Sequence, residues 1–341
     1  MKKELSHTPK LSDLYQAAIK FRDHACWNWM MDGDLFGVEN PETGEIGYCS
    51  ILGNLGEVFA LNVYPGSKGL ESYWKIYEYA KLMEEGVHIP MHLIMTSQIC
   101  LMASFENRKD LEKVDLDQIK SLNLKFKGSR NWPLFRNYLS GYAPWFFNEQ
   151  DVQFMTVALE QALIMAEEVK KKPELLEPER VDEERYLVRR LRNGQWLNEW
   201  HTPEVTSEPE KQIVVNELLL KKLKNQKLPR MGTWICDCIT LPVRIEEGPR
   251  PFFPMAFPVI NQQGFMVMME MFKPDDLETM LPNAFLDTLQ KVGNLPQEIF
   301  VGSDLAYDLL EPITTSLKIS LHQDENLPEL EALISHLDRF I

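Results

Sequence analysis

The stretch from Lys125 to Trp145 interleaves basic and aromatic side chains in a pattern that could bind an anion. It contains Lys125, Lys127, Arg130, Trp132, Arg136, Tyr142 and Trp145. Aromatic rings stack on nucleobases, and Arg side chains pair with phosphates or carboxylates. Our candidate ligand-binding residues are therefore Arg130, Trp132, Arg136 and Trp145. The same tract could instead clamp a neighbouring acidic surface of the protein. The binding interpretation requires an exposed Trp132 or Trp145.

The charge balance of the whole chain limits what that anion could be. The 341 residues include 51 Asp and Glu against 36 Lys and Arg, which gives a formal net charge of -15. Nucleic-acid-binding proteins need a basic surface to neutralise phosphates, and anionic membranes attract basic segments. The composition therefore disfavours both partners. It favours a folded globular protein, because 44% of the residues are hydrophobic and 26% are charged.

The five cysteines are odd in number and irregularly spaced, at positions 26, 49, 100, 236 and 238. This pattern does not predict a disulfide framework. No apolar stretch follows the first lysines, as it would in a signal peptide, and no window approaches the length of a membrane span. These features predict a cytoplasmic protein. No phosphate-binding glycine loop, nucleophile elbow or Cys-x-x-Cys pair is present, so no cofactor is expected.

The elements that must position these residues recur twice along the chain. Hydrophobic spacing predicts a helix at 11–24, strands at 26–32, 46–52 and 58–64, and a helix at 70–83. A helix at 210–227, strands at 233–238, 251–260 and 265–272, and a helix at 275–292 repeat that order. Trp234 lies 205 residues after Trp29, and Gly264 lies 208 residues after Gly56. We infer an internal duplication. The alternative is two unrelated α+β modules that share an element order.

Between these repeats, the first half has a less regular pattern. Residues 92–105 are strand-like, 116–122 helical, 127–137 a loop, and 148–171 a long helix. Asn193-Gly194 separates two strand-like runs, 186–192 and 195–200, which predicts a β-hairpin that pairs Leu191 with Trp196 and Leu187 with Trp200. Residues 202–210 are polar and contain two prolines. We therefore predict two domains, 1–205 and 206–341.

The second half continues with a strand at 297–302, a helix at 304–316, a strand at 318–322 and a helix at 327–340. The last two strands alternate with helices, so they should be parallel. The order β-β-β-α-β-α-β-α resembles the ribonuclease H-like fold of integrase and transposase cores, over roughly residues 230–341. Three tracts carry this resemblance: Trp234–Asp237, the hairpin tract Val259–Gly264, and Leu295–Asp304, whose strand ends before Asp304. The fold class expected is therefore two tandem α+β modules, the second ribonuclease H-like.

The ribonuclease H-like resemblance implies a site chemistry of its own. Nucleases of this fold gather carboxylates around two Mg²⁺ or Mn²⁺ ions. Asp237 and Asp304 occupy the positions of two of these carboxylates. Glu325, Glu329 and Glu331 are near the place of a third, but none has a defensible spacing, and Asn261 stands where an acid would complete the set. The alternative is a degenerate core in which Asp304 only caps its helix.

The chain as a whole resembles a family of uncharacterised bacterial proteins. The tracts that carry this resemblance are Phe36–Pro41, Gly53–Val58, Trp132–Arg136, Gly141–Trp145 and Arg250–Pro254. We expect a non-catalytic binding or interaction protein that takes an anionic ligand or protein partner and needs no metal. The alternative is a Mg²⁺- or Mn²⁺-dependent phosphodiesterase that uses Asp237 and Asp304, which would require a third carboxylate near them.

Overall fold

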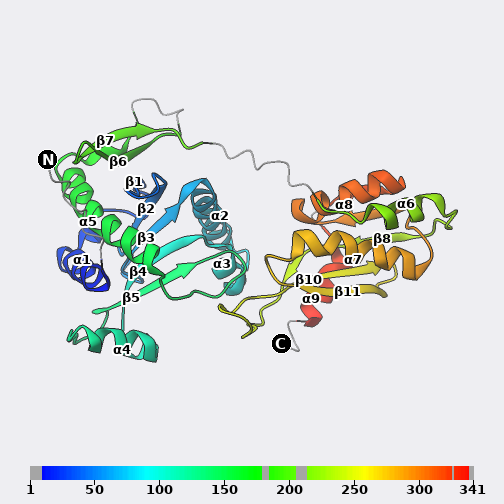
Figure 1. The fold of residues 1–341 in the computed structure, drawn as a ribbon, viewed down its shortest axis with the longest axis horizontal. Coiled ribbons are helices and arrows are strands. Elements are labelled where there is room, and N and C mark those ends of the chain that lie inside the picture. The colour runs from blue at the N-terminus through cyan, green and yellow to red at the C-terminus, as the bar shows by residue number, and fades with distance from the viewer. Residues whose placement is uncertain (1–9, 179–183, 205–212, 325, 338–341) are drawn as a thin grey trace. The chain divides into compact units, whose positions relative to one another are not determined.

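The computed structural model describes residues 10–178, 184–204, 213–324 and 326–337. These residues form two compact units, each with its own sheet (Figure 1). The first unit takes the described residues of 1–140 and 144–206, and the second takes 141–143 and those of 207–341. Within the described ranges, every helix is too short or too polar to cross a lipid bilayer. The predicted domain boundary after residue 205 lies outside these ranges.

The first unit is built on a mixed seven-stranded sheet with the order β5-β4-β3-β2-β1-β6-β7. The strands are β1 (Phe36–Glu39), β2 (Ile46–Leu52), β3 (Ala60–Pro65), β4 (Cys100–Glu106), β5 (Trp132–Tyr138), β6 (Tyr186–Arg192) and β7 (Gln195–His201). Neighbours in this order are antiparallel except β1 and β6, which are parallel, with Gly37 opposite Val188. The parallel pair therefore joins segments that are far apart in the sequence.

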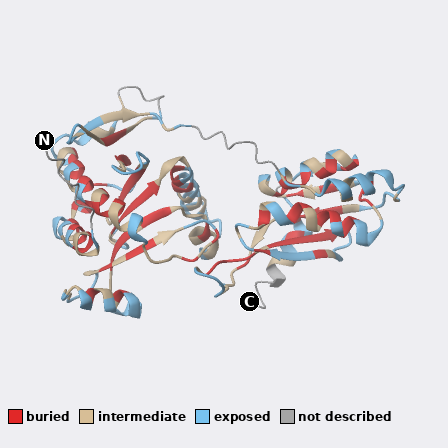
Figure 2. Ribbon diagram, viewed as in Figure 1, coloured by how far each residue is buried: buried red, intermediate tan, exposed pale blue. Residues whose placement is uncertain are grey.

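Helices cover both faces of this sheet. They are α1 (Leu11–His24), α2 (Gly66–Glu84), α3 (Met91–Ser97), α4 (Lys113–Ser121) and α5 (Glu149–Lys171). On one face, α1 and α5 contact each other and bury Cys49 and Ile51 of β2 in the main core. On the other face, Tyr48 of β2 packs with Leu70 and Tyr73 of α2. Successive side chains of β2 therefore point to opposite faces of the sheet and contribute to two cores. The helices bury the sides that face the sheet (Figure 2).

The predicted strand at 26–32 is wrong. Ala25 adopts a left-handed conformation and ends α1, and Cys26–Asn28 form one turn of 3₁₀ helix. Trp27 and Trp29 pack in the core of the first unit and do not belong to a strand. Trp27 is buried among aromatic rings, and the indole N–H of Trp29 donates to the carbonyl of Ala166 at 2.9 Å. The first strand begins later, at Phe36.

Two more predictions of the first half need correction. Residues 92–105 do not form one strand, because α3 occupies Met91–Ser97 before β4 begins. The predicted loop at 127–137 contains strand β5 from Trp132 onward. The basic and aromatic residues of this stretch suggested a loop. The strand nevertheless accommodates Pro133, because β5 lies at the edge of the sheet.

The predicted β-hairpin is confirmed in its turn and in its register. Leu191 lies opposite Trp196 and Leu187 opposite Trp200 in the β6–β7 pair. Leu187 is buried, and both tryptophans pack against the main core of the first unit. The hairpin therefore extends the first sheet and covers part of its core.

The second unit contains a mixed sheet with the main order β11-β10-β8-β12-β13, and β9 pairs with β10. Its strands are β8 (Thr233–Cys236), β9 (Ile239–Thr240), β10 (Met255–Asn261), β11 (Met266–Phe272), β12 (Glu298–Val301) and β13 (Ser320–Gln323). The helices are α6 (Glu217–Asn225), α7 (Leu277–Val292), α8 (Asp304–Leu317) and α9 (Pro328–Leu337). As predicted, β12 and β13 are parallel, and both run parallel to β8.

The sheet of the second unit also separates two apolar clusters. Trp234 and Cys236 of β8 face the cluster formed with α6, α7 and α8. Ile235, between them, faces the smaller cluster that contains Leu327 and Leu330 near α9. The fold class is therefore α+β in two modules, each with a mixed sheet. The predicted helix at 210–227 starts too early: residues 213–216 are not helical, and α6 begins at Glu217 because the Asn216 side chain accepts the Leu219 N–H at 3.1 Å as a cap. Residues 210–212 and the end of the predicted helix at 327–340 lie outside the described residues.

The two sheets share a local arrangement. In each, three antiparallel strands follow one another, and a later strand runs parallel to the first, as in β3-β2-β1-β6 and β11-β10-β8-β12. Trp29 and Trp234 are not equivalent, however, since Trp234 lies on a strand and Trp29 does not. The internal duplication remains a prediction.

Candidate functional site

A groove of about 720 Å³ lies over α4 in the first unit, and we call it the α4 groove. Its lining residues are Arg108, Lys113, Leu116, Asp117, Ile119, Lys120, Asn123, Leu124, Lys125 and Trp132. Four of these side chains are cationic and one is a carboxylate. Apolar side chains from α4 and the following loop, together with Asn123 and Trp132, complete the lining. The α4 groove is therefore a local basic site on a strongly acidic protein.

A buried ion pair docks α4 onto β5 and so shapes the α4 groove. The two terminal nitrogens of Arg136 donate to the two carboxylate oxygens of Asp115, at 2.9 and 2.8 Å. Arg136 also pairs with Glu112 at 3.2 Å and lies 4.6 Å from the ring centroid of Phe146. Burial opposes the charge of Arg136, but hydrogen bonds and the charge of Asp115 raise its pKa. Arg136 therefore serves the internal structure, not a ligand.

The cations of α4 line up because of helical spacing. Lys113, Asp117 and Lys120 occur at i, i+4 and i+7, which places them on one face of the helix. The helix begins at Lys113 because Asp115 accepts the backbone N–H of Glu112 at 2.9 Å, as in a capping box. The same carboxylate thus fixes the start of α4 and its attachment to the sheet.

The loop before β5 is held by Asn107, next to Arg108. The Asn107 side-chain oxygen accepts from the Ser129 hydroxyl at 2.6 Å and from the Arg130 backbone N–H at 3.3 Å. These hydrogen bonds position the loop that leads into Trp132, the first residue of β5. The Trp132 ring packs against Phe126, with the Arg108 guanidinium 5.9 Å from its centroid. Trp132 is half-buried, as is Trp145, so neither tryptophan is exposed as the binding interpretation of this tract required.

The cations of the α4 groove form no ion pairs within the described part of the chain, although Asp117 lies among them. Within the described part of the chain, no carboxylate forms an ion pair with Arg108, Lys113, Lys120 or Lys125. By contrast, the basic residues of the β6–β7 hairpin each face a glutamate. Unpaired cations beside an aromatic ring can hold an anion by charge and hydrogen bonding. This arrangement distinguishes the α4 groove from the β6–β7 hairpin.

The structure brings only Trp132 of the four predicted ligand-binding residues into the α4 groove. Arg130 donates to the carbonyl of Gly56 and lies over the ring of Phe59. Trp145 is half-buried, exchanges backbone hydrogen bonds with Asn137 and packs on Phe146. Arg130 and Arg136 therefore fit the alternative interpretation of this tract, an internal clamp.

Sequence reasoning missed Arg108, Lys113, Lys120, Asp117 and Asn123. The seven-residue spacing of Lys113 and Lys120 was a signal, but the predicted helix began at residue 116 and left Lys113 out, whereas α4 begins at Lys113. The tract from Lys125 to Trp145 contains only part of this site, because the α4 groove combines a helix with a later strand. Lys125 was in the tract and does line the α4 groove.

Comparison with protein-family models covers most of the two units. A model described as "Domain of unknown function (DUF7309)" matches residues 12–189, which is more than half of the chain. The chain belongs to the DUF7309 family. A second model, "Domain of unknown function (DUF6930)", matches residues 219–338. No curated protein matches the chain. The expectation of an uncharacterised family is confirmed, and the α4 groove lies wholly within the DUF7309 match.

The carboxylates predicted in the second unit lie within the DUF6930 match, after two adjacent strands. Asp237 follows β8 and Asp304 begins α8 after β12, and the last residues of these strands, Cys236 and Val301, are paired. Asp237 accepts hydrogen bonds from the Ser303 hydroxyl and, at 2.8 Å, from the Cys238 N–H. Asp304 accepts from the Gln323 amide at 2.7 Å. Each predicted carboxylate therefore already has a partner within the protein.

The expectation that Asp304 caps its helix is wrong. The cap of α8 is Ser303, whose hydroxyl accepts the Ala306 N–H at 3.2 Å. Among the described residues, no group of three His, Cys, Asp or Glu side chains could hold a metal ion. Glu329 and Glu331 are exposed on α9, and Glu325 lies outside the described residues. The described residues therefore supply two of the carboxylates that the ribonuclease H-like resemblance implies.

Asp237→Asn should increase the free energy of unfolding at pH 7. Burial raises the pKa of Asp237, although hydrogen bonds from Ser303 and Cys238 oppose this effect. A carboxyl with a raised pKa stabilises the fold when protonated, below its unfolded pKa of about 3.9, and that contribution is lost as the pH rises through the folded value. Urea unfolding at pH 7 and pH 4 measures the effect. The advantage of the variant should shrink at pH 4, and an unstable variant at pH 7 would contradict this account.

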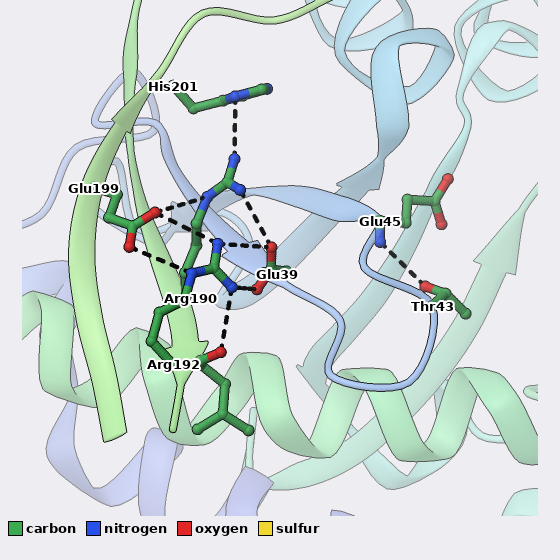
Figure 3. Close-up of polar contacts among 8 residues, drawn as sticks. Glu39, Thr43, Glu45, Arg190, Arg192, Glu199 and His201 are labelled. Atoms are coloured by element: carbon green, nitrogen blue, oxygen red, sulfur yellow. Dashed lines mark hydrogen bonds and ion pairs between the residues drawn. The ribbon is translucent and has the colours of Figure 1, made fainter. Parts of the chain in front are cut away.

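A second polar cluster, in the β6–β7 hairpin, lies largely beyond the DUF7309 match (Figure 3). Glu39 of β1 lies between Arg190 and Arg192 of β6, at 3.3 and 2.8 Å. Glu199 of β7 contacts both arginines, at 3.6 and 3.4 Å. Two arginines thus face two glutamates. This balanced set ties three strands together and leaves little charge for a ligand.

His201 makes this hairpin cluster sensitive to pH. Its Nδ1 lies 3.1 Å from Nη2 of Arg190. Arginine can only donate, so this nitrogen must accept and the imidazole must be neutral. Burial lowers the pKa of His201 and the charge of Arg190 lowers it further, while Glu204 opposes both. Protonation would place a second cation against Arg190.

We therefore expect the chain to lose stability as the pH falls below about 6.5, where an unfolded histidine titrates. A histidine with a lowered folded pKa contributes its stability above the unfolded value and loses it as the pH falls towards the folded value. Urea unfolding between pH 8 and pH 5 measures this slope. His201→Asn keeps an acceptor near the position of Nδ1 and should flatten the slope. Equal slopes in the wild type and the variant would count against the assignment.

Proposed function

We propose that this protein is a non-catalytic binding protein whose α4 groove takes an anionic ligand. The observation that carries the proposal is the group of four cations without described ion-pair partners around a half-buried tryptophan. The chain as a whole has a net charge of -15, so a local basic site is not a by-product of composition. Arg136 is buried and paired with Asp115, so it is not available to a ligand. The proposed binding surface is therefore centred on α4 and not on the tract from Lys125 to Trp145.

The overall charge also limits the size of the ligand. A long polyanion would meet the acidic remainder of the surface and be repelled. A compact anion would contact only the α4 groove, where Lys113, Lys120 and Lys125 lie at an exposed surface. Attraction between exposed charges is screened by salt, so binding should weaken as the ionic strength rises.

Calorimetric titration of the full chain with tripolyphosphate tests this proposal. Lys113→Glu with Lys120→Glu should weaken binding by roughly tenfold or more, since two attractions become repulsions and each tenfold is about 1.4 kcal/mol. Lys221→Glu with Lys224→Glu is the matched control, because α6 has the same length as α4 and both lysines are exposed. The proposal fails if wild type does not bind, or if both double variants lose affinity equally.

A second candidate is a Mg²⁺- or Mn²⁺-dependent phosphodiesterase in a ribonuclease H-like second unit. Its support is the parallel pairing of β8 with β12, which brings the strand ends before Asp237 and Asp304 to the same edge of the sheet. Calorimetric titration with Mn²⁺ separates the two functions. A tight site that Asp237→Asn with Asp304→Asn removes would favour the phosphodiesterase. Superimposed curves would exclude this site.

We also propose a cytoplasmic location. The support is chemical: all five cysteines are free thiols, and Cys26, Cys49, Cys100 and Cys236 are buried in the two units. Burial raises the pKa of each of these four thiols, which keeps them protonated and unreactive. A reducing compartment suits such a protein. Fractionation of cells that express the chain, followed by immunoblotting, tests the location.

A further inference from the structure

We infer that the ligand of the α4 groove is a nucleotide, with its phosphates on the lysines and its base against Trp132. This inference rests on the proposed anion-binding function and names the class of ligand. The argument is that the α4 groove contains a separate partner for each part of a nucleotide. Its volume of about 720 Å³ also lies in the range of small-molecule sites.

The aromatic part of the site is preorganised. Trp132 begins strand β5, where it lies opposite Glu106 of β4, so a sheet and not a mobile loop holds the indole. Phe126 packs against the ring, and the planar guanidinium of Arg108 lies 5.9 Å from its centroid. Arginine and tryptophan both stack on nucleobases. A simple inorganic anion would use neither planar surface.

The cationic side chains of the site are spread along α4 and are not gathered at one position. Lys113 and Lys120 lie on the same face of α4, seven residues and therefore about 10 Å apart along the helix axis. Lys125 adds a third ammonium group from the loop after α4. Long lysine side chains can converge on a chain of phosphates from these positions. A ligand with more than one phosphate matches this row better than a single phosphate does.

Asp117 separates a nucleotide from an acidic peptide. This carboxylate lies between Lys113 and Lys120 on the same helix face and is exposed. It would repel a run of acidic side chains laid across the lysines. Sugar hydroxyls, however, donate hydrogen bonds that a carboxylate accepts, as the acidic residue of dinucleotide-binding folds does for a ribose.

Asn123 supplies the polar contact that a base edge needs. Its backbone has a φ of 55°, and its N–H donates to the carbonyl of Lys120 at the end of α4. Its side-chain amide is exposed and has no hydrogen-bond partner among the described residues. An amide offers both a donor and an acceptor, which is the pairing that asparagine makes with adenine.

The test compares four probes on the full chain by calorimetry: ATP, tripolyphosphate, adenosine and a hexaglutamate peptide. We expect ATP to bind about tenfold more tightly than tripolyphosphate, because stacking adds to charge. Trp132→Leu should remove this advantage and leave the affinity for tripolyphosphate unchanged. Trp132→Phe should keep the advantage, which excludes a mere folding defect. Trp74→Leu, on the exposed side of α2, is the control and should change neither affinity.

The outcomes distinguish this inference from the proposed function. If tripolyphosphate binds through Lys113 and Lys120 but ATP binds no better, the nucleotide is excluded and the anion site stands. If hexaglutamate binds more tightly than ATP, the ligand is an acidic peptide and the nucleotide is excluded. If none of the anions binds, both proposals fail.

Discussion

Arg136→Met should lower the free energy of unfolding of the full chain by about 3–5 kcal/mol. The substitution leaves the Asp115 carboxylate buried, with only 4% of the residue exposed and without its bidentate partner. An unpaired charge in a nonpolar environment is among the most destabilising changes that a single substitution can make. The loss should also detach α4 from β5, because no other buried ion pair of the described residues joins them. Urea denaturation followed by circular dichroism measures the loss.

A double substitution provides the control for this prediction. Asp115→Leu together with Arg136→Met removes both charges and fills the same space with apolar atoms. Replacing a buried pair in this way is often neutral or stabilising. The double variant should therefore recover most of the stability that Arg136→Met loses. A double variant as unstable as the single one would show that volume, and not charge, dominates at this site.

Phe285→Ala should destabilise the second unit by about 3–5 kcal/mol, the usual cost of removing a fully buried phenylalanine. Phe285 lies on α7 with no exposed surface. Its ring meets Trp234 of β8 and Phe257 of β10 edge to face, with centroids 6.1 and 6.4 Å apart. The substitution therefore leaves a cavity where the helix contacts two strands. Hydrogen exchange resolved by peptide would report the loss in β8, β10 and α7.

Met280→Ala is the matched control, because Met280 lies on the same helix but is 54% exposed. It should change the stability by less than about 0.5 kcal/mol. Faster exchange throughout the first unit in Phe285→Ala would contradict the division into two units with separate cores.

The elements with strong local signals were predictable from the sequence. The helix at Leu11–His24, the strand at Ile46–Leu52 and the hairpin around Asn193-Gly194 have the predicted positions, and the hairpin has the predicted register. In each, periodicity or turn chemistry acts over a few residues, so the sequence contains the information locally. The order of the second unit was predictable for the same reason.

The errors occurred where tertiary contacts override local preference. Trp27 and Trp29 have high strand propensity, but Trp27 lies in a 3₁₀ turn, Trp29 follows that turn, and both pack in the core of the first unit. Basic and aromatic residues made 127–137 look like a loop, but the stretch contains an edge strand that tolerates Pro133, and Asp115 neutralises Arg136. The α4 groove was missed for a similar reason, because its cations come from segments that only the fold brings together.

The parallel pairing of β1 with β6 has a consequence for how the chain folds. Gly37 can contact Val188 only after the intervening residues have been synthesised and have closed a very long loop. Contacts of such sequence separation slow folding, because the chain loses much entropy before it gains the pairing. During translation, the edge of β1 that pairs with β6 therefore stays unpaired until the β6–β7 hairpin has been synthesised. During that time its backbone groups are open to other strands, so aggregation during translation should be most sensitive to substitutions in β1.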